Sequence, residues 1–137
     1  MQNTLKEENC ITAGTVRKYN RILVVDDQLI SAVPIMRMLK DSGYDICYVQ
    51  NGEAAVSIVG YGIPVDLVVM DIDLGDGICG IAASTLINAI RNIPVLFFTS
   101  HPENYVTDRI GEFTYAGYLS KQSSAELFTQ TVQRIIG

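Results

Sequence analysis

The sequence has little cysteine and no long apolar run. Its three cysteines, Cys10, Cys47 and Cys79, are widely spaced and form no CxxC pair. Such a set predicts neither a disulfide framework nor a zinc site and is typical of reduced cytosolic thiols. No apolar run approaches the roughly 18 residues that span a bilayer, and the N-terminus does not resemble a secretory signal. We therefore expect a cytoplasmic protein with no membrane association.

Positive charge is also scarce. Ten Lys and Arg residues stand against fifteen Asp and Glu residues, which gives a net charge of −5 and a pI near 4.7. The basic residues do not cluster, so we expect no nucleic-acid partner. With 137 residues, of which 48% are hydrophobic, the chain is long enough to fold as one domain without a disulfide or metal.

The chain divides at about residue 20. Residues 1–20 are polar and aperiodic, so we expect a tail or linker followed by one domain over residues 21–137. Short apolar runs then recur at 22–25, 67–70, 95–98 and 115–119, with a weaker candidate at 46–49. The first three are continuously apolar, which is typical of parallel strands buried on both faces.

Segments with helical spacing alternate with these runs. They are residues 29–40, 53–59, 81–90, part of 102–113, and a segment that begins within 123–126. Because Pro34 would break a helix interior, we expect the first helix to start near Ser31, with Pro34 in its first turn. Ser123 and Glu126 have the spacing of a capping box. The alternation predicts an α/β fold, a doubly wound parallel sheet with helices on both faces.

Polar residues follow four of the expected strands. They are Asp26, Asp27, Asp71, Asp73, Thr99 and Lys121. Because parallel strands end at one edge of a sheet, we expect these residues to lie close together there. Packed carboxylates repel one another unless a hard cation such as Mg²⁺ joins them. A carboxylate in such a site can attack a phosphoryl group, while a lysine and a hydroxyl bind phosphate oxygens.

With these residues in this order, the sequence resembles the receiver domain of two-component response regulators. The match is carried by ILVVDD (22–27), DLVVMD (66–71), PVLFFTS (94–100) and YLSK (118–121), over roughly residues 20–137. The resemblance implies a CheY-like, flavodoxin-like fold with five parallel strands in the order 2-1-3-4-5. It also implies a phosphoacceptor rather than an enzyme, supplied by a histidine kinase or a histidine phosphotransfer protein. The glycine-rich segment 74–80 resembles receivers associated with sensor kinases.

The resemblance also implies a role for each site residue. Asp71 corresponds to the phosphoacceptor and Lys121 to the phosphate-binding lysine. The Mg²⁺ ligands would be Asp26, Asp27, Asp71 and the backbone carbonyl of Asp73, with Asp27 binding directly and Asp26 largely through water. Thr99 and Tyr118 correspond to the switch residues that transmit phosphorylation to the fourth helix, fifth strand and fifth helix. Receivers often pair through this surface, so a homodimer is a candidate assembly.

Several residues depart from the family pattern and keep alternatives open. Gln122 stands where proline usually follows the lysine, which leaves the state of the Lys121–Gln122 bond open between cis and trans. The loop 74–80 also departs from the pattern, with Gly75 where proline is frequent and Cys79-Gly80 where Asp-Gly is frequent. Gln122 and this altered loop together motivate a second hypothesis, a receiver-fold interaction module that works without phosphate. The Asp71-Ile-Asp73 motif also matches the opening of haloacid-dehalogenase phosphohydrolases, although the order of the acidic pair argues against that family. His101, the only histidine, is interpreted as a loop residue, because no second histidine or cysteine offers it a partner.

Overall fold

The computed structural model describes residues 20–137 and contains one parallel five-stranded sheet. The strands are β1 (Arg21–Val25), β2 (Asp45–Val49), β3 (Leu67–Met70), β4 (Val95–Thr99) and β5 (Gly117–Ser120). They lie in the order β2-β1-β3-β4-β5, and every neighbouring pair is parallel. This confirms the expected doubly wound sheet. The expected tail lies outside the described residues, apart from Asn20.

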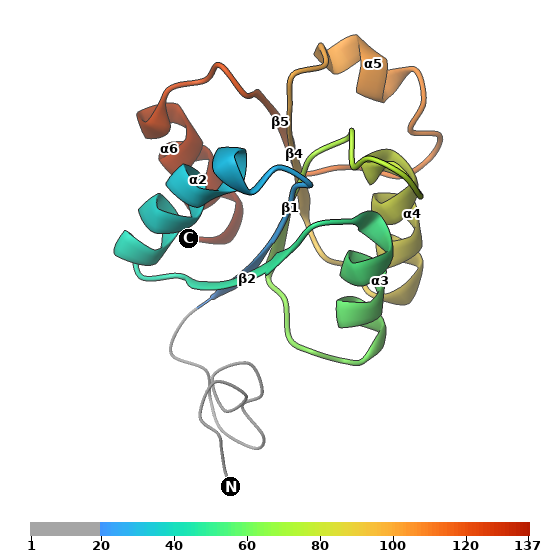
Figure 1. Cartoon of the computed structure of the whole chain (residues 1–137), viewed down its shortest axis with the longest axis horizontal. Helices are drawn as coiled ribbons and strands as arrows, with labels where there is room; N and C mark the ends of the chain where they lie inside the picture. Colours follow the sequence, from blue (N-terminus) through green and yellow to red (C-terminus); the bar gives the residue numbers. More distant parts are fainter. Residues whose placement is uncertain (1–19) are drawn as a thin grey trace, which may run out of the picture.

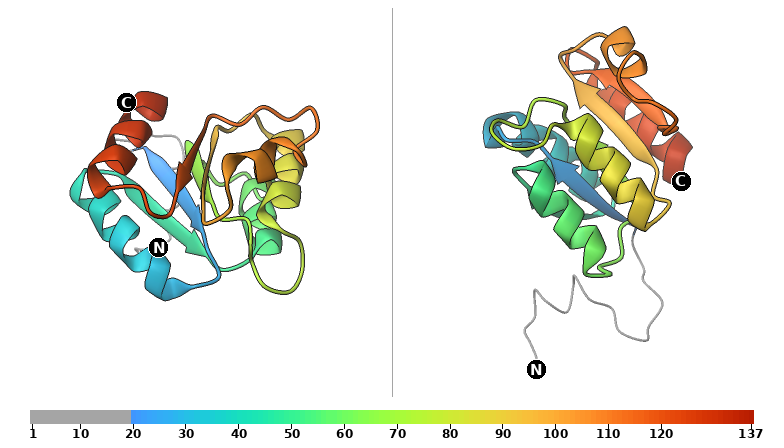
Figure 2. Two further views of the ribbon diagram at one scale, coloured as in Figure 1. Left: turned by 90° about the horizontal axis from the view of Figure 1, so that it is seen from above. Right: turned by 90° about the vertical axis from the view of Figure 1, so that its right-hand side faces the viewer.

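Helices cover both faces of the sheet. They are α2 (Leu29–Asp41), α3 (Gly52–Gly60), α4 (Gly80–Ile90), α5 (Glu103–Thr107) and α6 (Ala125–Ile136). The α2 and α6 helices lie on one face, and α3, α4 and α5 lie on the other (Figures 1 and 2). None of the helices in the range 20–137 is long and apolar enough to cross a membrane.

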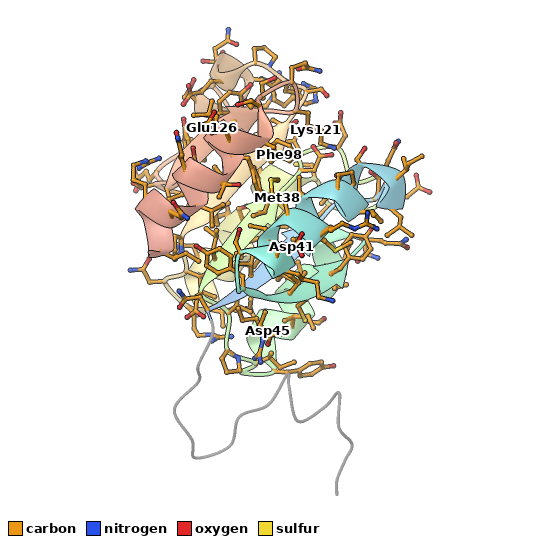
Figure 3. All side chains as sticks on the ribbon, turned by 90° about the vertical axis from the view of Figure 1, so that its left-hand side faces the viewer. Met38, Asp41, Asp45, Phe98, Lys121 and Glu126 are labelled. Carbon is orange, nitrogen blue, oxygen red and sulfur yellow. The ribbon has the colours of Figure 1, made fainter. Side chains whose placement is uncertain are left out.

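The alternation of side chains along β1 separates two hydrophobic cores. Ile22 and Val24 belong to the core under α2 and α6, whereas Leu23 and Val25 belong to the core under α3, α4 and α5. All four are fully buried, which explains why the strand is continuously apolar. Met38 of α2 and Phe98 of β4 line one pocket between α2 and α6 (Figure 3).

The α2 helix corrects the prediction for Pro34. The helix begins at Leu29, because the carbonyl of Gln28 already accepts from the amides of Ser31 and Ala32, so Pro34 is its sixth residue. A proline there leaves the carbonyl of Ile30 without its usual helical donor. Ile30 is 83% exposed, so its carbonyl lies on the solvent side of the helix, where water can take the place of the missing donor.

Other boundaries also differ from the predictions. Ser124, not Ser123, caps α6, since its side-chain oxygen accepts from the amide of Leu127 at 3.1 Å. The β5 strand begins at Gly117, two residues later than expected, and extends to Ser120. The segment 102–113 forms only a five-residue helix. No peptide bond among residues 20–137 is cis, so the Lys121–Gln122 bond is trans.

Arg21 stabilises the edge of the sheet where the strands begin. Its side chain is 2% exposed and donates from Nε and Nη2 to Oδ2 of Asp45 at 3.0 and 2.9 Å. Its Nη1 also donates to the carbonyl of Pro64 at 3.3 Å. Asp45 and Lys121 lie at opposite ends of the molecule (Figure 3). The contacts of Arg21 are therefore separate from the opposite edge of the sheet, where the candidate site lies.

Candidate functional site

The site lies where β1, β3, β4 and β5 end. Asp26 and Asp27 follow β1, Asp71 follows β3, Thr99 ends β4 and Lys121 follows β5. One carboxylate oxygen from each of Asp26, Asp27 and Asp71 lies within 4.8 Å of the others. Asp26, Asp71 and Thr99 are buried, whereas Asp27 is exposed. The parallel sheet thus brings together the residues that the sequence pattern singled out.

Lys121 holds two of the carboxylates. Its Nζ lies 2.8 Å from Oδ2 of Asp26 and 2.9 Å from Oδ2 of Asp71. The backbone amide of Lys121 donates to the carbonyl of Thr99 at 2.9 Å, which continues the pairing of β5 with β4 beyond the end of the strand. The lysine is therefore fixed by the sheet itself, and its ammonium is shared between two acids.

The charge of this cluster does not balance. Counted formally, three carboxylates and one ammonium give the cluster a charge of −2. Burial raises the pKa of Asp71, and its bonds to Lys121 and to the amide of Ile72 only partly offset this. Burial lowers the pKa of Lys121, but the two carboxylates outweigh it and the pKa lies above its usual value. A divalent cation would cancel the excess negative charge, and oxygen ligands suit Mg²⁺.

Hydrogen bonds fix the orientation of both buried acids. Oδ1 of Asp26 accepts from the amide of Gln28 at 2.9 Å, and Oδ1 of Asp71 accepts from the amide of Ile72 at 2.7 Å. The hydroxyl of Tyr48 on β2 donates to the carbonyl of Asp26 at 2.7 Å. Beside them lies a cavity of about 250 Å³, whose walls include Asp71 and Lys121. This cavity has room for a small anion next to the ammonium.

Gly80 lets the loop after β3 fold back against Asp71. The amide of Gly80 donates to the carbonyl of Ile72 at 2.8 Å. A Cβ atom at position 80 would lie 1.9 Å from the carbonyl oxygen of Asp71. Only glycine fits this approach of two backbone segments. The loop 72–79 is thereby held next to the carboxylates.

His101 lies in the loop after β4, as interpreted, and the structure adds an acidic partner for its ring. Its Nε2 lies 2.9 Å from Oδ2 of Asp73, and its ring stacks on Tyr105 with 4.0 Å between the ring centroids. The pair was not predicted from the sequence, although the sequence holds one signal of it. Asp73 follows β3 by three residues and His101 follows β4 by two, and the two strands are neighbours.

His101 also connects the two residues assigned as switches. Its backbone amide donates to the hydroxyl of Thr99 at 3.2 Å, and its carbonyl accepts from the hydroxyl of Tyr118 at 2.5 Å. The side chain of Asp73 is exposed and its contact is with His101, so it lies at the rim of the site. Thr99 and Tyr118 are thus linked through a single residue, which gives a route from the site to β5.

Comparison with known proteins identifies relatives over most of the chain. A family model described as the response regulator receiver domain matches residues 22–133. The chain is 25% identical over 119 residues to the polar-differentiation response regulator DivK of Brucella anthropi, covering 85% of this chain and 95% of that protein. It is 26% identical to the phyllosphere-induced regulator PhyR of Methylorubrum extorquens, covering 82% of this chain and 46% of PhyR.

Solved structures show the same fold. The N-terminal domain of a response regulator/sensory box/GGDEF three-domain protein from Carboxydothermus hydrogenoformans is 34% identical, with a TM-score of 0.80 over 85% of this chain and 94% of that one. The response regulator TrrA of Thermotoga maritima, solved in complex with Mg²⁺ and BeF, is 26% identical, with a TM-score of 0.75 over 85% of this chain and 98% of that one. The sheet order agrees with this likeness.

Proposed function

Because the chain belongs to the response regulator receiver domain family, we propose that it accepts a phosphoryl group on Asp71 in a Mg²⁺-dependent reaction. The observation that carries this proposal is the ammonium of Lys121 shared between Asp26 and Asp71 in a cluster with a charge of −2. Such a cluster is poised for a divalent cation and for an anionic group that the ammonium can bind.

In the proposed transfer, a carboxylate oxygen of Asp71 attacks the phosphorus atom of a phosphohistidine. The new P–O bond forms as the P–N bond breaks, and the imidazole of the donor leaves with the electron pair of that bond. Mg²⁺ would be held by Asp26, Asp27, Asp71 and the carbonyl of Asp73, and it would neutralise charge on the phosphoryl oxygens.

The chain's own residues position the phosphoryl group. In our proposal the ammonium of Lys121 exchanges one carboxylate contact for a phosphoryl oxygen, and the hydroxyl of Thr99 donates to another. A movement of that hydroxyl would disturb its bond from the amide of His101. Since the carbonyl of His101 accepts from Tyr118, the change would reach the surface formed by α5, β5 and α6.

The first turn of α2 offers a docking surface for the phosphoryl donor. Leu29, Ile30 and Val33 are exposed apolar residues, and Ile30 is 83% exposed. They begin two residues after Asp27, so they flank the entrance to the acidic cluster. We propose that a histidine kinase or a histidine phosphotransfer protein packs an apolar helix face here while its phosphohistidine reaches Asp71.

Two other hypotheses were open from the sequence, a haloacid-dehalogenase phosphohydrolase and a phosphate-independent interaction module. The family match favours a receiver over a haloacid-dehalogenase phosphohydrolase, and the proposed chemistry is acceptance of a phosphoryl group, with at most slow self-hydrolysis. The phosphate-independent module is an outcome of the test below. It was motivated by Gln122 and by the altered loop 74–80. With the bond before Gln122 trans, the ammonium of Lys121 still reaches both carboxylates.

Beryllofluoride tests the proposal without the need for a cognate donor. The melting temperatures of wild type and Asp71→Asn are measured with Mg²⁺ alone, with beryllofluoride alone and with both together. Because a ligand that binds only the folded state stabilises it, we expect a rise in melting temperature for wild type with both additions and no such rise for Asp71→Asn. A folded wild-type protein with no response to both additions would favour the phosphate-independent module instead.

The docking surface has a separate test. Wild type, Ile30→Glu and Leu127→Glu are phosphorylated by acetyl phosphate and by a phosphorylated histidine phosphotransfer protein. We expect Ile30→Glu to slow transfer from the protein donor at least tenfold and to leave the reaction with acetyl phosphate unchanged. Leu127 is 45% exposed on a different helix, α6, and serves as the matched control. Equal slowing by both variants would contradict the assigned surface.

A further inference from the structure

The α4 helix carries no charged residue. Its sequence, GIAASTLINAI, is the only one among the described helices that lacks Asp, Glu, Lys and Arg. One face packs inward through residues such as Ala83 and Ile87, which are fully buried. A helix at the surface of a monomer usually presents charged and polar residues on its opposite face, and a helix that is apolar all round is usually covered.

The outward face of α4 is a regular stripe. Its members are Ala82, Thr85, Leu86, Ala89 and Ile90, at helical positions i, i+3, i+4, i+7 and i+8. Leu86 is 48% exposed and Ile90 is 47% exposed. The one hydroxyl of the stripe, on Thr85, donates to the carbonyl of Ile81 at 3.1 Å. The stripe therefore has no polar group that covering it would leave without a partner.

A groove runs beside the stripe. It has a volume of about 480 Å³ and lies between α4, including Ala82 and Leu86, and the ring of Tyr105 on α5. The guanidinium of Arg109 lies 3.6 Å from the centroid of that ring, and its Nη1 donates to the carbonyl of Tyr105. The ring of His101 also stacks on Tyr105, so two side chains hold the aromatic ring that faces α4.

A second copy of the chain complements this face. Two α4 helices that cross antiparallel about a two-fold axis at Leu86 would place Ala82 of each copy against Ile90 of the other, a small side chain against a large one. The net charge of −5 opposes self-association through charged faces. The stripe itself is free of charge, so two copies can meet along it with the Leu86 side chains facing each other at the axis. Arg109 is the one charged residue in the wall of the groove beside the stripe.

We propose that the chain forms a symmetric dimer through the α4 stripe and the groove between α4 and α5. This surface differs from the pairing through α5, β5 and α6 that the resemblance suggested. The proposal goes beyond phosphoryl acceptance and does not depend on it. Because one helix face and one groove form a small interface, we expect a weak dimer, with a dissociation constant between about 10 µM and about 1 mM.

Analytical ultracentrifugation of the full chain tests the proposal over this concentration range. Leu86→Glu puts two carboxylates at the two-fold axis, so we expect its dissociation constant to rise at least tenfold. Ile90→Lys, at the edge of the stripe, should also weaken the dimer. The matched control is Leu127→Glu on α6, where a leucine of similar exposure is replaced in the same way. Thermal melting of each variant establishes that it is folded.

Three results would overturn the proposal. The first is a wild-type protein that is monomeric throughout the range. The second is a dimer that folded Leu86→Glu and Ile90→Lys leave unchanged. The third is a loss of dimer in Leu127→Glu as large as that in Leu86→Glu, which would move the interface to α6. A dimer that Leu86→Glu and Ile90→Lys weaken and that Leu127→Glu retains supports an interface at the stripe.

Discussion

The ammonium of Lys121 lies 2.9 Å from Oδ2 of Asp71, although 50 residues separate the two in the chain. The same nitrogen lies 2.8 Å from Oδ2 of Asp26, at a separation of 95 residues. Contacts between residues so far apart in the sequence arise because β1, β3 and β5 are parallel and end at one edge of the sheet. The chemistry we propose and the stability of the metal-free protein both depend on this shared ammonium.

Replacement of Lys121 by Met should destabilise the metal-free protein. Two buried carboxylates would lose their counter-charge, and removal of one partner from a buried ion pair costs about 3 kcal/mol. Urea unfolding in EDTA measures this difference. Lys40→Met, at an exposed position of α2, is the control and should change the free energy of unfolding by less than about 0.5 kcal/mol. Similar losses in both variants would contradict the role of the ammonium.

Asp71→Asn should alter how stability depends on pH. The pKa of Asp71 is raised in the folded protein, so the unfolded chain releases this proton first as pH rises. Stability contributed by the protonated carboxyl is therefore present below its usual pKa of 3.8 and is lost as pH rises through the raised value. In EDTA, we expect the melting temperature of Asp71→Asn minus that of wild type to increase between about pH 4 and about pH 7.

Mg²⁺ provides the control for this pH dependence. A bound divalent cation favours the ionised carboxylate, so saturating Mg²⁺ should reduce the difference between wild type and Asp71→Asn at neutral pH. The result that contradicts this prediction is a difference in melting temperature that stays constant with pH and does not respond to Mg²⁺. It would show that folding does not raise the pKa of Asp71.

Gly80→Ala should destabilise the fold strongly. The added Cβ would lie 1.9 Å from the carbonyl oxygen of Asp71, so either α4 or the end of β3 must move. We expect a loss of about 3 kcal/mol or more, measured by urea unfolding. Gly60→Ala at the end of α3 is the matched control, because its nearest neighbour is Cδ1 of Ile90 at 4.0 Å. That change should leave stability equal or raise it by up to about 1 kcal/mol.

Arg21→Met should separate stability from the chemistry of the site. The guanidinium is buried and holds Asp45 at the edge where the strands begin, so its loss should cost about 3 kcal/mol. The melting-temperature response to Mg²⁺ with beryllofluoride should persist, because Asp71 and Lys121 lie at the other edge. Loss of that response in a folded variant would show that the two edges are coupled.

The sheet and the gathering of polar residues could be predicted from sequence for one reason. Strands buried on both faces are continuously apolar, as Leu67–Met70 shows, and parallel strands bring the residues that follow them to one edge. The closeness of Asp71 and Lys121 could therefore be predicted from the sequence.

The features that sequence analysis missed depend on local contacts. Pro34 is tolerated inside α2 because the carbonyl it leaves unpaired lies on the solvent side, and exposure cannot be judged from helical spacing alone. Ser123 and Ser124 are both good capping residues, and only the path of the turn after β5 decides between them. Asp73 and His101 lie in two different loops, and their contact depends on how far each loop extends beyond the sheet. The order of the residues in the sequence does not give this.

The most direct test of the account is the intact mass of the protein after incubation with acetyl phosphate and Mg²⁺, followed by mapping of the modified residue. We predict that wild type gains one phosphoryl group, that the group maps to Asp71, and that EDTA or Asp71→Asn prevents the gain. An equal gain in folded Asp71→Asn, or a gain in EDTA, would contradict the account.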